Sequence, residues 1–472
     1  MAEKIAEDLI ARLQGLIEPS VTALAATSAP CRRREYERVM LAHAKLRQRT
    51  AIQLLRVLGP EMYLDDPRIL LALDRSPYAY ERNGQSVQTV GMMGRLTHVP
   101  EYLLDMQELV KQTGNDLRTR VTRRRLGKVK VYGVGGSAAP AGLAKEILTN
   151  SGRLSFEFEV VRRDSPRFDA VDKETLLVFS SFSGNTEETL HCLDLAVKSG
   201  RAEGGMVAMS TGGCLKEKAC QNKVPWIQIP PRVCQPRESA ALQVVAILAI
   251  ISELGLPSGD AAGSPFSLKR RMLEETGEGL RDLTKALHWA VPYRDNPAKQ
   301  MAVKLLYREA GWAGSGAGRA PMGLPLIPIV LSSASHEAVA YELYTQLCEA
   351  SKILCHVATC PEALHNLVES MKFGLVSGQG HPWSLYFMES DDDEPRVADR
   401  WCHTLQEVFP EVEPCSFKAT GRTAFERSMS LYYFNAWLRL YLAFLNGAEP
   451  LPVPTMDHMK EYMKGIKRRE CG

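Results

Sequence analysis

Apolar positions follow two different rhythms along this chain. Residues 1 to about 115 lack strand-like alternation and are rich in helix formers, for example over Glu3–Leu16 and Glu35–Leu58. Beyond residue 128, short apolar and β-branched runs alternate with helical segments, and each short run predicts a strand. The expected strands of this middle part are Val129–Val134, Phe156–Val161, Leu176–Ser180, Met206–Ser210 and Trp226–Ile229.

A break rich in Gly, Pro and Ser, from Gly255 to Pro265, precedes a second set of runs. Strands separated by helices predict parallel sheets covered by helices, and 472 residues exceed the ~250–300 at which a single core stops growing. We therefore expect a helical extension at residues 1–115, an α/β domain at 116–258 and a second one at 259–472. The second set comprises strands at Leu326–Leu331, Ile353–Ala358, Ser384–Met388 and Pro414–Lys418, then helices at Thr423–Leu445 and Met456–Lys467.

Composition excludes several classes of protein. The hydrophobic and charged fractions, 45% and 24%, are ordinary for a globular protein, and a net charge of +3 gives no reason to expect a nucleic-acid partner. Basic stretches at Arg32–Arg34 and Arg118–Lys130 are interpreted as solvated faces, and Asp391–Glu394 as an exposed acidic turn. The longest apolar run, Ala240–Ile251, is interrupted by Gln243 and is shorter than the ~18–20 residues of a membrane span, which predicts a buried helix and no membrane contact.

Cysteine usage indicates the compartment. Eleven cysteines are scattered without paired spacing, and the N-terminal Met-Ala-Glu-Lys lacks a signal-peptide pattern, so we expect a reducing cytoplasm. A zinc site could be sought among four residues, but two of them, Cys355 and His356, are adjacent in an expected strand and point to opposite faces. We therefore expect no metal. The other two candidates are Cys348 and Cys360.

Two of the expected strands end in small and hydroxyl-bearing residues. One delivers Gly133-Val134-Gly135-Gly136-Ser137 and the other Ser181-Phe182-Ser183-Gly184-Asn185-Thr186, and each segment opens a helical pattern. Helix N-termini offer free amides and a partial positive charge, and Ser and Thr hydroxyls add hydrogen bonds without bulk. These groups suit a phosphate ester. The expected phosphate ligands are Ser181, Ser183 and Thr186, with the amides around Gly135, Gly136 and Ser137.

These segments resemble a known family. Gly-Gly-Ser followed by Ser-x-Ser-Gly-Asn-Thr-Glu-Glu-Thr resembles the sugar isomerase (SIS) domain, and the second motif is similar to that of bifunctional phosphoglucose/phosphomannose isomerases. Those proteins carry two SIS domains in one chain, which implies two flavodoxin-like α/β domains here, with parallel sheets flanked by helices, beside the helical extension. Further segments resemble the family in the same order: Gln235-Pro236-Arg237, Cys348–Lys352, Pro361–Asn366, and Gly447–Val453 with Met459-Lys460.

The resemblance implies an isomerase that interconverts glucose 6-phosphate, and mannose 6-phosphate, with fructose 6-phosphate through a cis-enediol. Glu349 is the expected base, since a carboxylate can carry a proton between adjacent carbons. His365 suits ring opening because an imidazole gives and takes protons near neutral pH, and Lys460 could share that task. Arg237 stays charged and can stabilise the enediolate. The chemistry requires no cofactor, and the family implies a homodimer in which the histidine comes from the neighbouring chain.

The chain departs from the family pattern beside these residues. Cys348 and Ala350 replace the asparagines that flank the base. Leu364 and Leu367 replace an Asn and a Glu next to the histidine, so polar support for the chemistry is thinner. The N-terminal extension and the glycine-rich loop Gly311–Gly323 have no counterpart in the family.

Two other functions stay open at this point. A non-catalytic SIS-domain sensor or regulator of sugar phosphates would keep both loops while losing catalytic support. A dinucleotide-dependent oxidoreductase would use Gly133 and Gly135 as a partial fingerprint and Glu157 or Glu159 as ribose ligand, but it leaves the second hydroxyl-rich loop without a role. The charged site residues also have a structural interpretation as solvated surface groups.

Overall fold

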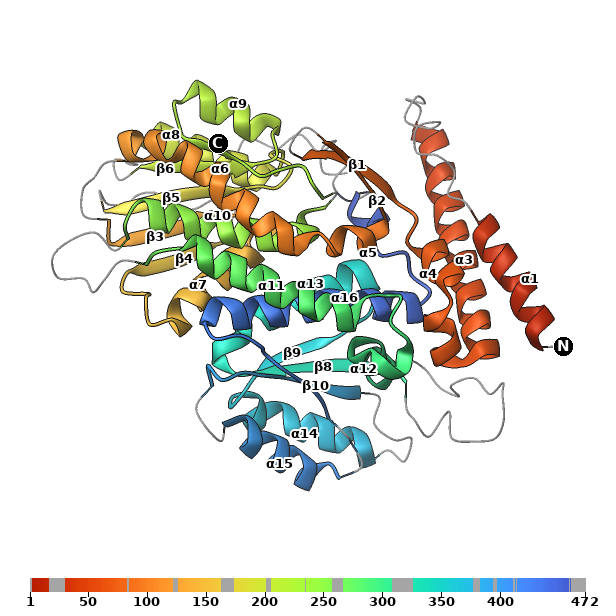
Figure 1. Ribbon diagram of the computed structural model, residues 1–472. Helices are drawn as coiled ribbons and strands as arrows, with labels where there is room; N and C mark the ends of the chain where they lie inside the picture. The colour runs from red at the N-terminus through yellow and green to blue at the C-terminus, as the bar shows by residue number, and fades with distance from the viewer. Residues whose placement is uncertain are drawn as a thin grey trace.

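Two parallel sheets and the helices around them make up most of the molecule (Figure 1). The computed structural model describes residues 2–16, 30–82, 85–121, 126–162, 174–200, 205–233, 235–256, 266–307, 326–376, 383–393, 397–410, 412, 414–457 and 459. It therefore covers most of both predicted α/β domains and of the N-terminal extension.

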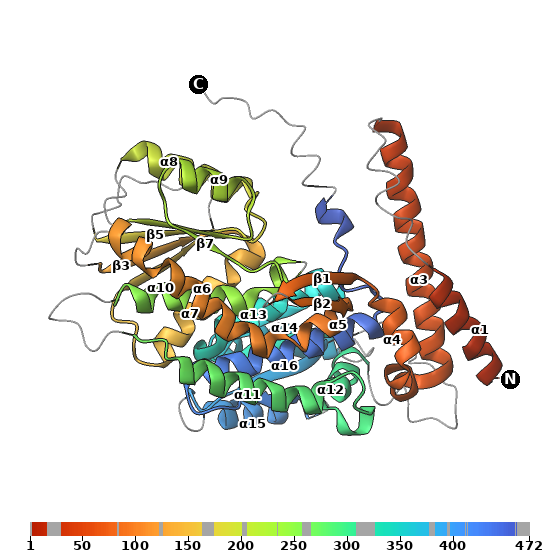
Figure 2. The same ribbon diagram turned by 45° about the horizontal axis from the view of Figure 1, so that its top comes forward.

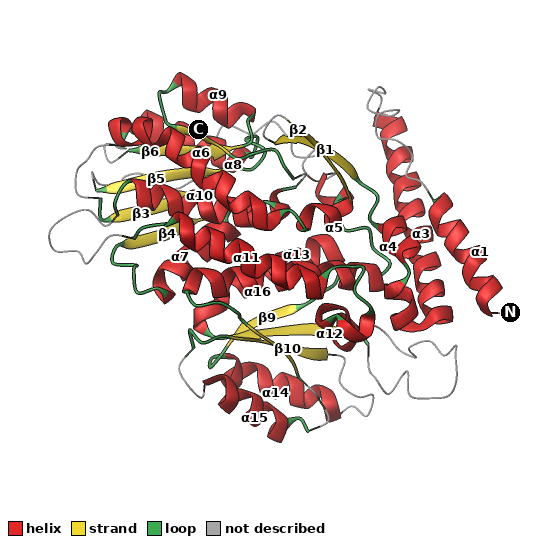
Figure 3. Cartoon of the chain, in the orientation of Figure 1, coloured by secondary structure: helices red, strands yellow, loops and turns green. Residues whose placement is uncertain are grey.

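The N-terminal region is helical except for one hairpin. Helices α1 (Ala2–Gly15), α3 (Pro30–Asp65) and α4 (Pro67–Leu73) pack together at one side of the molecule (Figure 1). Strands β1 (Pro77–Arg82) and β2 (Gln85–Val90) then pair antiparallel, so the expectation of helix throughout this region is wrong here (Figure 3). A contact distant in sequence supports the hairpin, because Tyr78 Oη donates to Pro231 O over 2.6 Å. Helices α5 (Gly91–Leu96) and α6 (Val99–Arg120) follow.

The first sheet has five parallel strands in the order β4-β3-β5-β6-β7. The strands are β3 (Lys128–Tyr132), β4 (Glu157–Val161), β5 (Thr175–Ser180), β6 (Met206–Ser210) and β7 (Trp226–Gln228). Its helices are α7 (Ala139–Asn150), α8 (Glu187–Ser199), α9 (Gly213–Gln221) and α10 (Ala240–Glu253). Every residue of β5 is buried, which requires cover on both faces of the sheet. Figure 2 shows that cover: α8 and α9 lie on one face, and α6, α7 and α10 on the other.

The second sheet repeats the strand order of the first. Its four parallel strands are β8 (Ile327–Ser332), β9 (His356–Thr359), β10 (Trp383–Glu389) and β11 (Cys415–Lys418), in the order β11-β10-β8-β9. In each sheet the first strand lies between the second and the third, so the loops after these strands converge at one edge. The helices of this unit are α11 (Arg270–Leu287), α12 (Pro297–Leu306), α13 (Glu337–Gln346), α14 (Ala363–Val376) and α15 (Val397–Val408).

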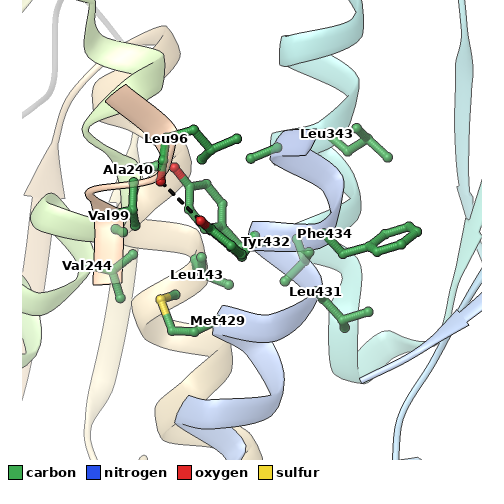
Figure 4. Packing of buried hydrophobic residues seen from close by; sticks show 14 of the residues in the cluster. Leu96, Val99, Leu143, Ala240, Val244, Leu343, Met429, Leu431, Tyr432 and Phe434 are labelled. Carbon is green, nitrogen blue, oxygen red and sulfur yellow. Dashed lines mark hydrogen bonds between the residues drawn. The ribbon is translucent and has the colours of Figure 1, made fainter. Parts of the chain in front are cut away.

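Helix α16 (Ala424–Leu445) joins the cores of both units and is buried over nearly its whole length. Figure 4 shows Tyr432 on the side of this helix that faces Leu143 of α7 and Val244 of α10. Phe434 points to the other side and stacks on Phe417 of β11 with ring centroids 3.7 Å apart. A helix that is buried on all sides is typical of such a shared core.

The predicted α/β class is confirmed, with parallel sheets flanked by helices and a largely helical N-terminal region. All nine expected strands are present near their expected bounds, and α16 matches the helix predicted at Thr423–Leu445. Strand β9 begins later than predicted, because Ile353 closes a turn through its amide to Leu347 O over 3.0 Å. Among the helices that the structure describes, none is long and apolar enough to cross a membrane. Three predicted features lie wholly or mostly outside the described residues: the domain boundary near 258, the loop Gly311–Gly323 and the helix Met456–Lys467.

Candidate active site

The first glycine-rich loop follows strand β3. Residues Gly135–Ser137 form a single 3-10 turn before α7. A Cβ on Gly136 would lie 3.0 Å from the Pro236 side chain and 3.4 Å from the Arg237 backbone nitrogen. The missing side chain therefore lets this loop lie directly against Arg237.

The second loop, Ser181–Thr186, connects β5 to α8. Ser181 is fully buried; its Oγ lies 2.8 Å from Thr186 Oγ1 and accepts a hydrogen bond from Gly184 N over 3.1 Å. Ser183 is exposed and Thr186 half-buried. Ser181 thus holds the loop in shape, whereas Ser183 and Thr186 can reach a ligand at the N-terminus of α8.

One hydrogen bond joins the two loops, and a buried glutamine supports both. Phe182 N donates to Ser137 Oγ over 3.1 Å. Ser180 Oγ donates to Gln243 Oε1 over 3.1 Å, and Gln243 Nε2 donates to Gly136 O over 3.4 Å. The sequence marked Gln243 only as an interruption in an apolar helix. Its role as a link between the loops depends on contacts that the sequence pattern does not contain.

A third loop, not recognised from the sequence, packs against the second. A Cβ on Gly184 would lie 1.9 Å from Gly212 O, so only glycine fits there. Asn185 Oδ1 accepts a hydrogen bond from Cys214 N over 3.1 Å, and Thr211 N donates to Phe182 O over 2.8 Å. The signal that could have revealed this loop is the Gly-Gly pair after the strand Met206–Ser210.

Arg237 and Glu349 meet beside these loops. Arg237 Nη1 donates to Glu349 Oε2 over 3.2 Å, and the two side chains are 2% and 24% exposed. Burial lowers the pKa of Arg237, while the Glu349 carboxylate opposes that shift. The pair therefore places a fixed cation next to a carboxylate that a substrate can reach from solvent.

A second, fully buried ion pair fixes the turn that carries Arg237. Arg95 Nε donates to Glu238 Oε1 over 2.6 Å, with side chains only 1% and 5% exposed. The other carboxylate oxygen of Glu238 accepts from Gln235 N over 3.1 Å and closes the turn Pro236–Glu238. Breaking such a buried pair costs about 3–5 kcal/mol. The position of Arg237 is therefore strongly determined.

Glu349 lies on a π-helical turn, Leu347–Ser351, which continues α13. Such turns are rare and often occur at functional sites. Ser351 Oγ donates to Arg439 O over 2.6 Å, which anchors the turn to α16. Arg439 is itself buried and donates a hydrogen bond from Nη1 to Gln346 Oε1. Glu349 is thus attached to the core of the second unit.

Lys352 closes the π-helical turn with a left-handed φ of +55°. Its Nζ donates to the carbonyl oxygens of Glu349, Glu449 and Pro452 over 2.7, 3.0 and 2.8 Å. Although the residue as a whole is exposed, burial around the amine, and then the Arg237 charge, lower the pKa of Lys352 to about 7. The contacts assign this lysine a role in holding backbone, not in reaching substrate.

Known proteins match this chain over most of its length. A family model for the bacterial phospho-glucose isomerase C-terminal SIS domain matches residues 323–463. The bifunctional phosphoglucose/phosphomannose isomerase of Caldicellulosiruptor bescii is 28% identical over 383 residues, which cover 80% of this chain and 100% of that protein. The chain is a relative of these isomerases. Its counterparts in Aquifex aeolicus and Thermoplasma acidophilum are 25% and 26% identical, over 70% and 77% of this chain and 89% and 98% of theirs.

Solved structures share the fold of this chain. A hypothetical protein from Thermus thermophilus aligns with a TM-score of 0.57 at 15% identity, over 79% of this chain and 90% of that one. Tagatose-6-phosphate ketose/aldose isomerase from Escherichia coli aligns with a TM-score of 0.53 at 13% identity, over 76% and 94%. At these identities the likeness concerns the fold alone. With the family model, it confirms the predicted class of SIS domains.

Of the two remaining predicted site residues, the structure describes only His365, and it shows no contact between His365 and the Arg237–Glu349 pair. His365 lies on α14 and is exposed, and no described residue forms a hydrogen bond or ion pair with its side chain. Lys460 lies outside the described residues. Leu364 and Leu367, which replace polar family residues, pack against the core of the second sheet. These leucines anchor α14 and leave His365 facing outward.

In the second sheet of this chain, buried charged residues follow the strands at the edge where the first sheet has its two glycine-containing loops. Asp392 belongs to the stretch predicted as an exposed acidic turn, but its side chain is 3% exposed and pairs with Arg427 of α16. The prediction holds for Asp391, which is exposed, and fails for Asp392 because the counter-charge comes from a distant element. His336, also buried, lies 3.8 Å from Asp392 and 3.5 Å from Glu146 of α7.

The structure does not support the dinucleotide site or the metal site that were considered as alternatives for this chain. Glu157 and Glu159, the candidate ribose ligands, pair across β3 and β4 with Lys128 and Lys130 at 3.7 and 2.9 Å. Their exposed cross-strand pairing is an ordinary surface arrangement. Within the described ranges, no three His, Cys, Asp or Glu side chains lie close enough to hold a metal ion.

Proposed function

We propose that the chain is an aldose–ketose isomerase that interconverts glucose 6-phosphate, and mannose 6-phosphate, with fructose 6-phosphate. The observation that carries this proposal is the contact between Arg237 and Glu349 next to two loops of phosphate-binding type. The relatives that match 70–80% of the chain are named for these two activities.

The two loops bind the substrate through its phosphate group. Ser183 and Thr186 donate hydroxyl hydrogen bonds to it, and the amides of Gly135 and Gly136 face it from the neighbouring loop. The Ser137 amide donates within that loop to Val134 O over 3.1 Å. The start of α8 adds the partial positive charge of a helix N-terminus. Binding energy from this end of the substrate aligns the reacting carbons with the base, so the contacts affect turnover as well as affinity.

Glu349 removes the proton from one carbon and returns it to the adjacent one, through a cis-enediol. The Arg237 guanidinium, held 3.2 Å from this carboxylate, stabilises the oxyanion that develops during the transfer. Because Arg237 is buried and rigidly supported, it reorganises little when that charge appears. The reaction moves a proton between carbons, and the proposal therefore includes no redox cofactor and no metal.

Ring opening needs an acid and a base at the ring oxygen and the anomeric hydroxyl. We assign this step to His365, with Lys460 as a second group. Since His365 is exposed and lacks a described side-chain partner, we propose that it enters the site of a neighbouring copy in a homodimer. No disulfide joins the cysteines that the structure describes, which fits a reducing cytoplasm as the place of action.

A non-catalytic sugar-phosphate sensor is the competing function. A sensor needs the loops but gains nothing from a buried guanidinium directed at a half-exposed carboxylate. The named activities of the relatives also favour the enzyme.

A coupled assay tests the proposal. Purified protein, without added metal, is assayed for conversion of fructose 6-phosphate to glucose 6-phosphate and, separately, to mannose 6-phosphate. We expect turnover of both, and its loss in Glu349→Gln. No turnover in the wild type, with sugar-phosphate binding intact by calorimetry, would replace the isomerase by the sensor.

A further inference from the structure

The N-terminal extension reaches the segment that follows α16. Gln48 Nε2 of α3 donates to Asn446 O over 3.1 Å. A Cβ on Gly447, whose φ is +63°, would lie 3.0 Å from both Ala51 Cβ and Gln48 O. Helix α3 therefore packs directly on this turn, and glycine is required where the backbones approach.

A buried ion pair fixes the same contact. Arg47 of α3 pairs with Glu449, and the two side chains are only 6% and 14% exposed. Arg47 also donates to Leu16 O over 3.5 Å. Arg47 thus ties the end of α1 and the body of α3 to the residues just beyond α16.

The opposite side of this segment holds the catalytic pair. Arg237 Nη2 donates to Pro450 O over 3.1 Å and also contacts Leu451 O. Asn446 Nδ2 donates to Ser351 O over 3.0 Å, at the end of the turn that carries Glu349. Residues 446–452 therefore form a layer between the extension and the Arg237–Glu349 pair.

We propose that Arg47 is a positioning residue for the isomerase site: its ion pair with Glu449 fixes the Pro450 and Leu451 carbonyls that orient Arg237 towards Glu349. The inference rests on the proposed function and gives the extension a role in it. Without Arg47, the Glu449 carboxylate loses its buried partner and residues 446–452 lose a fixed point. A guanidinium displaced by about 1 Å costs on the order of 100-fold in turnover.

Steady-state kinetics of full-length variants test this. Arg47→Met should lower kcat for fructose 6-phosphate by roughly 10- to 100-fold while KM changes little, because the phosphate loops keep their own support. Arg47→Lys, which keeps the charge, should restore a large part of kcat. Arg49→Met removes an exposed arginine from the same helix and should match the wild type. Wild-type kcat in folded Arg47→Met would overturn the proposal, as would a KM effect alone.

A double-mutant cycle separates positioning from general destabilisation. If Arg47 acts through Glu449, Arg47→Met combined with Glu449→Gln should be no slower than the worse single variant. Additive losses would refute the pathway. Amide hydrogen exchange in residues 446–453 reads the same coupling without turnover, and Arg47→Met should accelerate it. If the wild type does not isomerise, the proposed function fails, and unchanged exchange in this segment would then independently overturn the Arg47 link.

Discussion

Arg237 donates a hydrogen bond to Glu349 although 112 positions separate them in the chain. The arginine belongs to the unit with the first sheet and its two glycine-containing loops, and the carboxylate belongs to the unit with the second sheet. The site therefore exists only while the two units are docked. Helix α16, which packs into both cores, maintains that docking and also anchors the turn of Glu349 through Ser351.

Replacing Arg237 by Met should reduce kcat by about 10²- to 10³-fold, the usual cost of losing an oxyanion-stabilising group, with a smaller change in KM. Steady-state kinetics with fructose 6-phosphate measure both constants. Arg270→Met, which removes an exposed arginine from α11, is the control and should leave them unchanged. Near-normal kcat in Arg237→Met would remove the arginine from the chemistry.

The double variant Ser183→Ala with Thr186→Ala should raise KM for glucose, mannose and fructose 6-phosphates alike. Each hydrogen bond to a charged group contributes about 1.5–3 kcal/mol, so the increase should be at least tenfold. Ser181→Ala offers a contrast, because its buried hydroxyl bonds within the loop and its loss should lower the melting temperature. An effect on one substrate only would show that these residues read the sugar and not the phosphate.

Gln243→Leu should destabilise the protein by about 1–3 kcal/mol, because it leaves the buried groups that pair with the amide unsatisfied. KM should rise as well, since the same amide links both loops. Denaturant unfolding and kinetics on one preparation measure the two effects. Gln221→Leu, at the exposed end of α9, is the control. Lower stability with unchanged KM would limit Gln243 to a structural role.

The local sequence was sufficient to predict the strands and the positions of the two loops, because both depend on residues that are neighbours in the chain. The run Leu176–Phe179 is apolar throughout, and a strand with that pattern needs cover on both faces of its sheet. The turn after it is rich in Ser, Gly, Asn and Thr, residue types that favour turns and helix starts. The same local logic failed for the hairpin β1–β2, which gains its support from Pro231 in a later loop.

The rest of the site depends on pairs that no local pattern encodes. The sequence predicts Asp392 as a surface residue, but in the structure Arg427 of α16 pairs with it and its side chain is buried. In the sequence Arg47 is one of several charged residues in the segment that forms α3. In the structure it forms a buried ion pair with Glu449. In both cases the burial follows from how helices dock, and that arrangement is a property of the whole core.

Stability should depend on pH through Glu342, which is buried near Arg439. Burial raises the pKa of Glu342 from 4.5 to about 7. Between these values the unfolded chain loses a proton that the folded chain keeps. The associated stabilisation is therefore complete below pH 4.5 and is lost as the pH rises through about 7. Glu342→Gln removes this dependence, and its stability relative to wild type should grow by up to about 3 kcal/mol over that range.

Guanidinium unfolding at about pH 5 and about pH 8 measures the effect of Glu342. Glu337→Gln, an exposed substitution on the same helix, is the matched control and should show no such trend. An equal difference between Glu342→Gln and wild type at both pH values would contradict the linkage.

Cys348, next to Glu349, should be the most reactive thiol of the described cysteines. A hydrogen bond with the Cys355 thiol lowers the pKa of Cys348 to about 7 and raises that of Cys355. Because the thiolate is the nucleophile, iodoacetamide should modify Cys348 faster at neutral pH than it modifies the exposed Cys214 and Cys220. Peptide mass spectrometry after short labelling gives the three rates.

The pH dependence of this labelling tests the thiol pair itself. The rate at Cys348 should rise through pH of about 7 and then level off, as the thiolate fraction does. Cys355→Ala removes the hydrogen-bond partner, so the rise should move to higher pH. Labelling should also inactivate the enzyme, since the adduct lies one residue from Glu349, and fructose 6-phosphate should slow it. Equal rates at all three cysteines, or an unshifted profile in Cys355→Ala, would show that the pair does not activate Cys348.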